Sequence, residues 1–294
     1  MKERIEFRIS NKYAHLLLNP NKIKKNNSNT VIYLTKDNPE FERIKVLTQE
    51  IREKYNDFFF LYSNVKRVYS KRELEIAVLL RVKIKTTFEP AGEECGTVYD
   101  ETLACEICGA NRRQIGPLKL KKSTIPKNDI ARTIAGEVVV SKKFVTAFEQ
   151  RGLKGVSFDP ITFTKGVSNI YQLNVFSPAL ELTPNTIAGV NIFDLSESSN
   201  GVEFTIPGGY QIKVEKEIYK CPRGHTIGLN LLSEPYVFNS SSINEYDFFV
   251  SNQKVGVKRG LLRPEPIYFC STAFKKMVEE EKLSGFGYEI ARVG

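Results

Sequence analysis

The stretch "LACEICGANRR", residues 103–113, holds two cysteines in a C-x2-C arrangement followed by a glycine. Such a turn presents two thiolates from one backbone loop, and the glycine lets the chain fold back so that amide groups approach the sulfurs. Zinc binds four ligands in a tetrahedron, mostly cysteine sulfur and histidine nitrogen. This stretch therefore supplies half of a metal site, and another part of the chain must supply the rest.

The missing half lies in "YKCPRGHTIGLN", residues 219–230, which holds two ligands in a C-x3-H arrangement with Gly224 before the histidine. We expect one structural zinc to bridge the two turns through Cys105, Cys108, Cys221 and His225. A site closed by four protein ligands leaves no position for a catalytic water, so the metal is expected to support the fold. Cys95, in "GEECGTVYD", stays open as an alternative ligand.

Two stretches that follow these turns resemble each other: "VVVSKKFVTAFEQRGLKGVSF" (138–158) and "IYFCSTAFKKMVEEEKLSGFGY" (267–288). In each, an apolar strand ends at a serine that can cap a helix, and the helix ends at a Leu-x-Gly exit into another strand. At a constant offset of 130, the matching positions are Ser141, Phe144, Phe148, Leu153, Gly155 and Phe158 with Ser271, Phe274, Val278, Leu283, Gly285 and Tyr288. The pattern predicts an internal duplication.

The N-terminal part predicts a separate layer of strands and one helix. The segments "RIEFRIS" and "NTVIYLT" have the β-branched and aromatic bias of strands, with a polar loop expected at 19–30 between them. Asn38 is a suitable N-cap, and the apolar spacing that follows predicts an amphipathic helix over 39–55. Residues 73–88 have the composition of one long strand, with Arg81, Lys83 and Lys85 on one of its faces.

These patterns predict a mixed α+β protein. The expected parts are an N-terminal α/β region and two related zinc-knuckle/β-α-β modules that one structural zinc bridges. Their expected ranges are 1–90 for the N-terminal region, 91–165 for the first Cys-turn module, 166–204 for a connection and 205–294 for the second module.

Composition and motifs limit the function. Lys and Arg number 43 against 34 Asp and Glu, which gives a formal charge of +9 and favours an acidic partner. The first residues lack the apolar run of a signal peptide and no stretch is long enough to span a bilayer, so we expect a cytoplasmic protein without a membrane partner. Neither a nucleophile elbow, nor a phosphate-binding loop, nor a zinc-protease motif occurs, which favours a non-enzymatic binding protein.

Basic residues near the cysteine turns suggest an alternative role in nucleic-acid binding, because lysine and arginine neutralise backbone phosphates. The candidates for such contacts are Arg112, Arg113, Lys121, Lys122, Lys258 and Arg259. This alternative describes a zinc-dependent nucleic-acid-binding or regulatory protein.

The paired cysteine turns, each followed by the Ser-x-x-Phe…Leu-x-Gly unit, resemble a bacterial family known as double-CxxCG motif proteins. The stretches "PAGEECGTVYDETLACEICGA" and "CPRGHTIGLNLLSE" with "VGVKRGLLRPEPIYF" resemble uncharacterised bacterial proteins, and the resemblance covers roughly residues 90–294. Cys105, Cys108 and Gly109 match the first CxxCG motif and Cys221 opens the second, where Gly224 and His225 replace the Cys-Gly ending.

The resemblance implies an immunity-like protein that occludes a partner toxin, and the basic charge would suit a toxin with an acidic face. Loops on a rigid scaffold usually make such contacts, and those at 19–30, 190–203 and 239–247 are the candidates.

Overall fold

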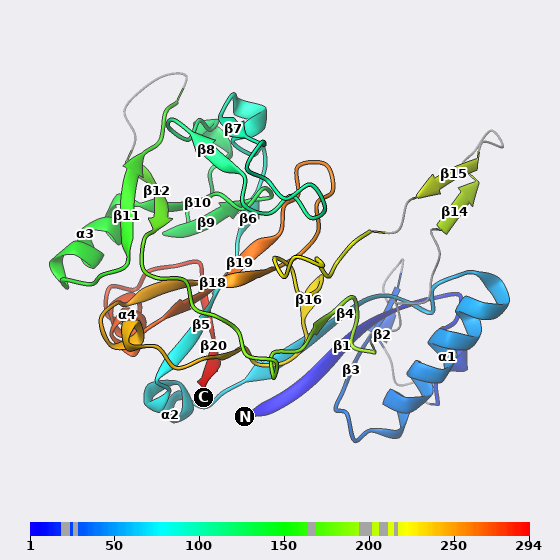
Figure 1. Ribbon diagram of the computed structural model, residues 1–294. Helices are drawn as coiled ribbons and strands as arrows, with labels where there is room; N and C mark the ends of the chain where they lie inside the picture. Colours follow the sequence, from blue (N-terminus) through cyan, green and yellow to red (C-terminus); the bar gives the residue numbers. More distant parts are fainter. Residues whose placement is uncertain (19–23, 26–28, 164–168, 194–201, 206–210, 215–216) are drawn as a thin grey trace. The chain divides into compact units, whose positions relative to one another are not determined.

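A computed structural model describes residues 1–18, 24–25, 29–163, 169–193, 202–205, 211–214 and 217–294 (Figure 1). Within these ranges the protein is mixed α+β, mostly strands, with four α-helices. The chain divides into two compact units: residues 1–70 with 189–216, and residues 71–188 with 217–294. These divisions differ from the ranges expected from the sequence, because the strand at 79–84 belongs to a sheet of the second unit.

The first unit contains a four-stranded antiparallel sheet in the order β2-β3-β1-β4. Its strands are β1 (Lys2–Ser10), β2 (Lys24–Lys25), β3 (Asn29–Leu34) and β4 (Phe60–Val68), and a 3-10 turn η1 (Ala14–Leu16) follows β1. A separate hairpin, β14 (Val202–Thr205) with β15 (Gln211–Val214), belongs to the same unit.

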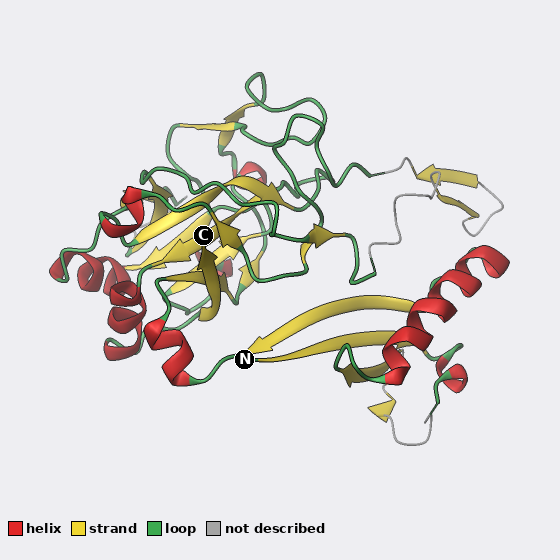
Figure 2. Cartoon of the chain, turned by 60° about the horizontal axis from the view of Figure 1, so that its bottom comes forward, coloured by secondary structure: helices red, strands yellow, loops and turns green. Residues whose placement is uncertain are grey.

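Helix α1 (Pro39–Tyr55) lies across one face of this sheet (Figure 2). The side chain of its N-cap, Asn38, accepts a hydrogen bond from Glu40 N at 2.9 Å, so the expected helix and its cap are confirmed. The apolar residues of α1 and β1 form one core, in which Phe7 and Phe41 also contact Phe193. Alternation along β1 sends one set of side chains into this core and the other to the opposite face.

The second unit contains two five-stranded sheets. The first has the order β11-β12-β10-β9-β6, with β6 (Thr87–Phe88), β9 (Ile130–Thr133), β10 (Val138–Ser141), β11 (Val156–Pro160) and β12 (Ile170–Val175). The second has the order β17-β20-β5-β19-β18, with β5 (Leu79–Ile84), β17 (Tyr236–Val237), β18 (Phe248–Val255), β19 (Glu265–Cys270) and β20 (Phe286–Val293).

Shorter elements complete the second unit. Two small two-stranded sheets pair β7 (Val98–Asp100) with β8 (Arg113–Ile115), and β13 (Ala188–Gly189) with β16 (Asn230–Leu231). The remaining turns and helices are α2 (Lys71–Ile76), η3 (Glu93–Cys95), η4 (Lys122–Thr124), α3 (Lys142–Gln150), η6 (Ser241–Asn244) and α4 (Thr272–Glu280).

The long strand expected over 73–88 is wrong in its first part, which forms helix α2. Its sequence, "KRELEI", consists mostly of straight-chain residues with high helix propensity, and Lys71 pairs with Glu75 one turn later at 3.6 Å. Only from Leu79 does the chain become a strand. On it, Arg81 and Lys83 do share a face, where both bind Glu289 at 2.8 and 3.1 Å.

The two large sheets repeat one arrangement. In the first, β10 pairs with β9 and β12, and β12 pairs with β11. In the second, β19 pairs with β18 and β5, and β5 pairs with β20. Strand β5 therefore occupies in the second sheet the position that β12 occupies in the first. In sequence, however, β5 comes before the other strands of its sheet, whereas β12 comes after the other strands of its own sheet. In each half this fourth strand lies between the hairpin and the strand that follows the helix.

The helices α3 and α4 begin in the same way. Ser141 and Ser271 each accept a hydrogen bond from the amide three residues later, at 3.1 Å in both cases. Each serine hydroxyl also donates to an aspartate at 2.7 Å, Asp129 in the first half and Asp247 in the second. The caps that the sequence predicted are confirmed, whereas the aspartates were not foreseen.

Each aspartate also accepts hydrogen bonds from a residue of the other half. Asp129 accepts from the backbone N and the hydroxyl of Ser284 at 2.8 and 2.9 Å, and Asp247 accepts from Lys154 N at 2.9 Å. Lys154 and Ser284 are equivalent residues at the exits of α3 and α4. The rings of Phe144 and Phe274 lie 6.0 Å apart between the two helices. The two halves therefore contact each other reciprocally.

Candidate metal centre

The first cysteine turn lies in the connection between β7 and β8. Cys105 N donates to Ala110 O at 2.8 Å, and Gly109 N donates to Cys105 O at 2.7 Å, which closes the turn. Gly109 has a φ of +66°, in the left-handed region that favours glycine. Both sulfurs therefore lie on one small loop at the end of a hairpin.

The second turn has the same form. Cys221 N donates to Thr226 O at 3.0 Å, Gly224 N donates to Cys221 O at 2.9 Å, and Gly224 has a φ of +78°. The turn is attached to strand β18, because Lys254 N donates to the carbonyl oxygen of His225 at 2.8 Å. The backbone of His225 is thereby held by a strand of the second five-stranded sheet.

The four expected ligands lie together. One donor atom from each of Cys105, Cys108, Cys221 and His225 falls within 4.8 Å of all the others. Cys105 Sγ is 3.9 Å from Cys221 Sγ, and His225 Nδ1 is 3.8 Å from Cys108 Sγ and 3.7 Å from Cys221 Sγ. Around a zinc ion with Zn–S near 2.3 Å and Zn–N near 2.0 Å, tetrahedral ligand atoms are about 3.5–3.8 Å apart. The cluster could hold a metal ion, and its dimensions fit zinc.

The two cysteines of the first turn differ in how readily they ionise. Hydrogen bonds from the backbone amides of Cys108 and Ile107 lower the pKa of Cys105 to about 6, so this thiol ionises readily. Burial raises the pKa of Cys108 to about 11. All three cysteines are free and buried, with no disulfide among them. A bound cation would favour the thiolate at both positions of the first turn.

Two residues that the sequence analysis did not single out link the turns. Lys254 Nζ donates to Asn111 Oδ1 at 2.7 Å, which joins strand β18 beside the second turn to the end of the first. Asn111 has a φ of +70°, a conformation that asparagine tolerates better than most residues. A side chain at Gly109 would overlap Lys258, whose aliphatic chain covers that glycine. In the sequence, the asparagine that follows "CGA" was the one residue that could have indicated this left-handed turn and its link to the second turn.

The remaining cysteines and the other histidine do not join this group. Cys95 ends the 3-10 turn η3 and is half-buried. Cys270 lies in β19 with no exposed surface, where burial raises the pKa of its thiol. His15 lies in η1 of the first unit.

The six basic candidates are in different environments. Arg112 is held inside the fold: it pairs with Glu93 at 2.9 Å and Glu101 at 3.3 Å, and its guanidinium lies 3.8 Å from the ring centroid of Tyr99. Arg259 is exposed and pairs with Glu217 at 3.3 Å. The other four residues are exposed. Arg113 lies in β8, Lys122 begins η4, Lys121 precedes η4, and Lys258 lies beside the first turn.

Of the three candidate contact loops, 19–30 and 190–203 fall largely outside the described residues. The loop at 239–247 contains η6, whose first residues are capped by Ser240. It is tied to the first half through Asp247. Its end is thus fixed to the scaffold, while Asn239, Ser241, Asn244 and Glu245 of the same loop are exposed.

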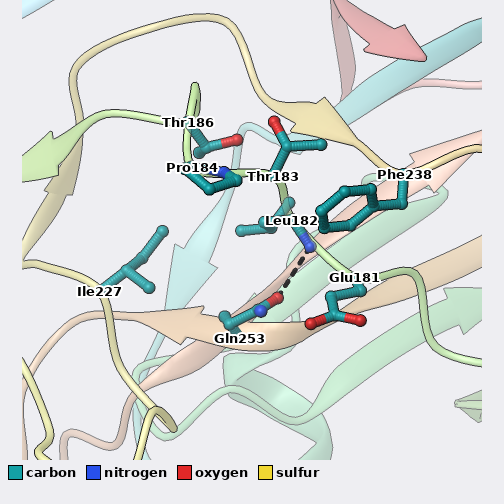
Figure 3. Close-up of a pocket in the computed structure, with 8 residues that line it drawn as sticks. All are labelled: Glu181, Leu182, Thr183, Pro184, Thr186, Ile227, Phe238 and Gln253. Atoms are coloured by element: carbon teal, nitrogen blue, oxygen red, sulfur yellow. Dashed lines mark hydrogen bonds between the residues drawn. The ribbon is translucent and has the colours of Figure 1, made fainter. Parts of the chain in front are cut away.

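A pocket of about 350 Å³ lies between residues 181–186 and strand β18 (Figure 3). Its main polar groups already hold this segment in place: Gln253 Oε1 accepts from Leu182 N at 2.9 Å, and Thr186 Oγ1 donates to Tyr236 O at 2.9 Å. Glu181 is the one acidic or basic side chain among the residues that line the pocket, so the lining pairs no acid with a base.

No protein-family model matches this chain, and no curated protein sequence matches it. Among the described helices, none has the length and apolar composition needed to cross a membrane.

Proposed function

We propose that the Cys3His cluster binds one structural zinc ion and that the protein acts by binding a partner. The observation that supports the metal is the approach of four ligand atoms from two separate turns to distances suited to a tetrahedron. Sulfur-rich tetrahedral sites select zinc among the common divalent cations. The two turns and the halves that carry them then form two related zinc-knuckle/β-α-β modules bridged by this ion.

The ion would contribute to folding directly. The turns contain buried thiols close to one another, and without a cation their ionised forms would repel. Since the two turns are far apart in sequence, all four ligands come together only in the folded chain, so the binding free energy of the ion adds to the stability of the fold. A complete set of protein ligands leaves no open position on the metal for a substrate or water, which supports a structural role.

The proposed partner is another protein, and the proposed role is that of an immunity-like protein that occludes a toxin with an acidic face. The resemblance of residues 90–294 to double-CxxCG motif proteins supports this role. The positive charge of +9 supports an acidic partner, since complementary charge accelerates association and favours the correct orientation.

Two measurements test this proposal separately. Elemental analysis of the purified full chain should give one zinc per chain, and a preparation that is folded but free of zinc would refute the structural metal. For the partner, the protein encoded beside this one is expressed alone and together with it. The expected result is arrested growth, relief by this chain and co-purification of the pair. Arrest that this chain leaves unrelieved would refute the immunity role.

A further inference from the structure

Among the described residues of the first unit, helix α1 packs on one face of the sheet and no helix packs on the other face, which carries an unusual set of side chains. Along β1, Ile5, Phe7 and Ile9 point into the core under α1, so the intervening residues lie on the opposite face. Register places Tyr33 and Asn64 beside Glu6, Tyr62 beside Arg8, and Lys66 beside Arg4. We define the open face by these residues: Lys2, Arg4, Glu6, Arg8, Tyr33, Tyr62, Asn64 and Lys66.

Two tyrosines on this face are exposed and each is paired with a cation. Tyr33 is 54% exposed and Tyr62 is 43% exposed. The guanidinium of Arg8 lies 4.7 Å from the ring centroid of Tyr62, and Lys66 Nζ lies 5.1 Å from that of Tyr33. The pairs hold the rings in place on a flat scaffold while leaving much of their surface accessible.

A buried carboxylate between the tyrosines fixes both cations. Glu6 accepts from Arg8 Nε at 3.0 Å and from Lys66 Nζ at 2.5 Å, and its side chain is only 5% exposed. Burial alone would raise the pKa of Glu6, but the hydrogen bonds from Lys66 and Arg8 outweigh it and lower the pKa. The carboxylate is thus ionised at neutral pH and its charge is compensated.

The charge that remains on the open face is positive. Of the residues that define this face, one is acidic, Glu6, and four are basic: Lys2, Arg4, Arg8 and Lys66. Phosphate groups match this surplus, and the exposed rings offer stacking surfaces to unpaired bases. A duplex keeps its bases stacked inside, so only a single strand can use both features.

We infer that the open face binds single-stranded nucleic acid, with Tyr33 and Tyr62 stacking on bases and Arg4, Arg8, Lys2 and Lys66 contacting phosphates. This surface belongs to the first unit, whereas the metal ligands and all six basic residues expected from sequence to bind nucleic acid belong to the second. The inference rests on neither the zinc nor the proposed protein partner.

Fluorescence anisotropy of the full chain tests this inference, with labelled RNA and DNA strands of about 12 nucleotides, a length within the usual site sizes. A duplex of the same sequence is the comparison. Binding should be at least tenfold tighter to a single strand than to the duplex, and affinity should fall steeply between about 50 and 200 mM salt. The RNA and DNA arms identify which strand is preferred, and binding of either supports the inference.

Matched variants locate the site. The double variant Tyr33→Ala/Tyr62→Ala should weaken single-strand binding by about tenfold or more, because stacking is lost. The control is Tyr55→Ala at the end of α1, since Tyr55 is 55% exposed and has Lys54 Nζ 5.2 Å from its ring centroid. This control should bind as the unchanged protein does.

The charge contribution has its own pair of variants. Arg4→Gln should reduce the slope of log affinity against log salt by about 0.7, the amount for one contact with a single strand. Lys45→Gln removes the same charge from the exposed side of α1 and should leave the slope almost unchanged.

Three results would overturn the inference, provided that circular dichroism shows folded protein. They are equal affinity for duplex and single strand, equal losses in Tyr55→Ala and in the double variant, and displacement of the strand by polyglutamate at equal charge concentration. The last result would mean that the face recognises acidic polypeptide.

Discussion

Cys105 Sγ lies 3.9 Å from Cys221 Sγ, although 116 positions separate the two residues in the chain. This distance is far beyond the 2.05 Å of a disulfide bond and close to the separation of two sulfurs on one zinc ion, about 3.8 Å. Cys105 ionises readily because backbone amides donate to its sulfur. A second thiolate so near in a buried site is costly unless a cation compensates it.

We predict that Cys105→Ser and Cys221→Ser both abolish zinc binding and lower the stability strongly. Zinc binds hydroxyl oxygen much more weakly than thiolate, and a site with three ligands no longer holds the two turns together. Zinc content from elemental analysis and the thermal unfolding midpoint measure the effect, and we expect the midpoint to fall by more than about 8 °C or the protein to become insoluble.

The control for this prediction is Cys95→Ser. Cys95 lies at the end of η3, outside the cluster of four. We expect this variant to keep one zinc per chain and an almost unchanged midpoint. Loss of zinc in Cys95→Ser would instead assign Cys95 to the metal, and retention of zinc in Cys105→Ser would contradict the proposed ligand set.

A second prediction concerns His225. Because thiolate and imidazole are both good zinc ligands, His225→Cys should retain one zinc per chain, whereas His225→Ala should lose it. A cobalt-substituted sample provides the measurement, since its absorption reports how many thiolates bind. The expected change is from three thiolates to four. A folded His225→Cys protein without metal would show that the turn accepts only imidazole.

Local sequence patterns predicted several features correctly. Asn38, Ser141 and Ser271 cap the helices that their positions indicated. The four residues of the Cys/His cluster could also be chosen from sequence, because C-x2-C and C-x3-H turns have few other uses in a chain with only five cysteines, and the structure brings these four together. These features depend on residues within a few positions of one another.

Features that depend on distant pairing were missed. Nothing in the residues of β5 indicates that this strand lies between β19 and β20, because strand partners are set by the whole sheet. For the same reason, the open face could not be recognised: Tyr33, Glu6 and Tyr62 come together only through the register of three strands. Asp129 and Asp247 were also missed, since each binds a residue of the opposite half.

The reciprocal contact between the halves leads to a third prediction, at Gly155. This glycine has a φ of +116°, and a Cβ there would overlap the carbonyl oxygen of Phe248. Gly155→Ala should therefore cost about 3 kcal/mol or more, from backbone strain and the displacement of strand β18. Urea unfolding monitored by circular dichroism provides the free energy of unfolding.

A matched substitution at Gly152 distinguishes the cost of backbone strain from the cost of displacing strand β18. It also has a positive φ, +63°, but a Cβ there would meet nothing within 4 Å. Gly152→Ala should cost only about 1 kcal/mol, the strain of the left-handed conformation alone. Equal losses in the two variants would mean that the contact between Gly155 and Phe248 contributes little. The equivalent glycine of the second half, Gly285, faces Ile130 O and should behave as Gly155 does.

A fourth prediction concerns the pH dependence that Asp129 produces. Burial tends to raise the pKa of Asp129, but hydrogen bonds from Ser284 and Ser141 outweigh burial, and the folded-state pKa lies below the usual value. A lowered pKa means that the carboxylate stabilises the fold above the unfolded-state pKa of about 3.9 and loses this effect as the pH falls through the folded-state pKa. Asp129→Asn should therefore cost about 2 kcal/mol at pH 7, where a charged acceptor of several hydrogen bonds is lost.

The difference in unfolding free energy between Asp129→Asn and the unchanged protein should shrink steadily below pH 4, and urea unfolding at pH 7, 5 and 3.5 measures it. Comparison at each pH removes effects shared by both proteins, such as loss of a bound metal ion. Asp159→Asn is the control, because Asp159 is exposed and accepts one hydrogen bond from Asn174 at 2.8 Å. We expect this control to cost less than about 0.5 kcal/mol at every pH. A cost for Asp129→Asn that is as large at pH 3.5 as at pH 7 would assign the effect to packing at the contact between the halves, since a protonated carboxyl and an amide then differ little in charge.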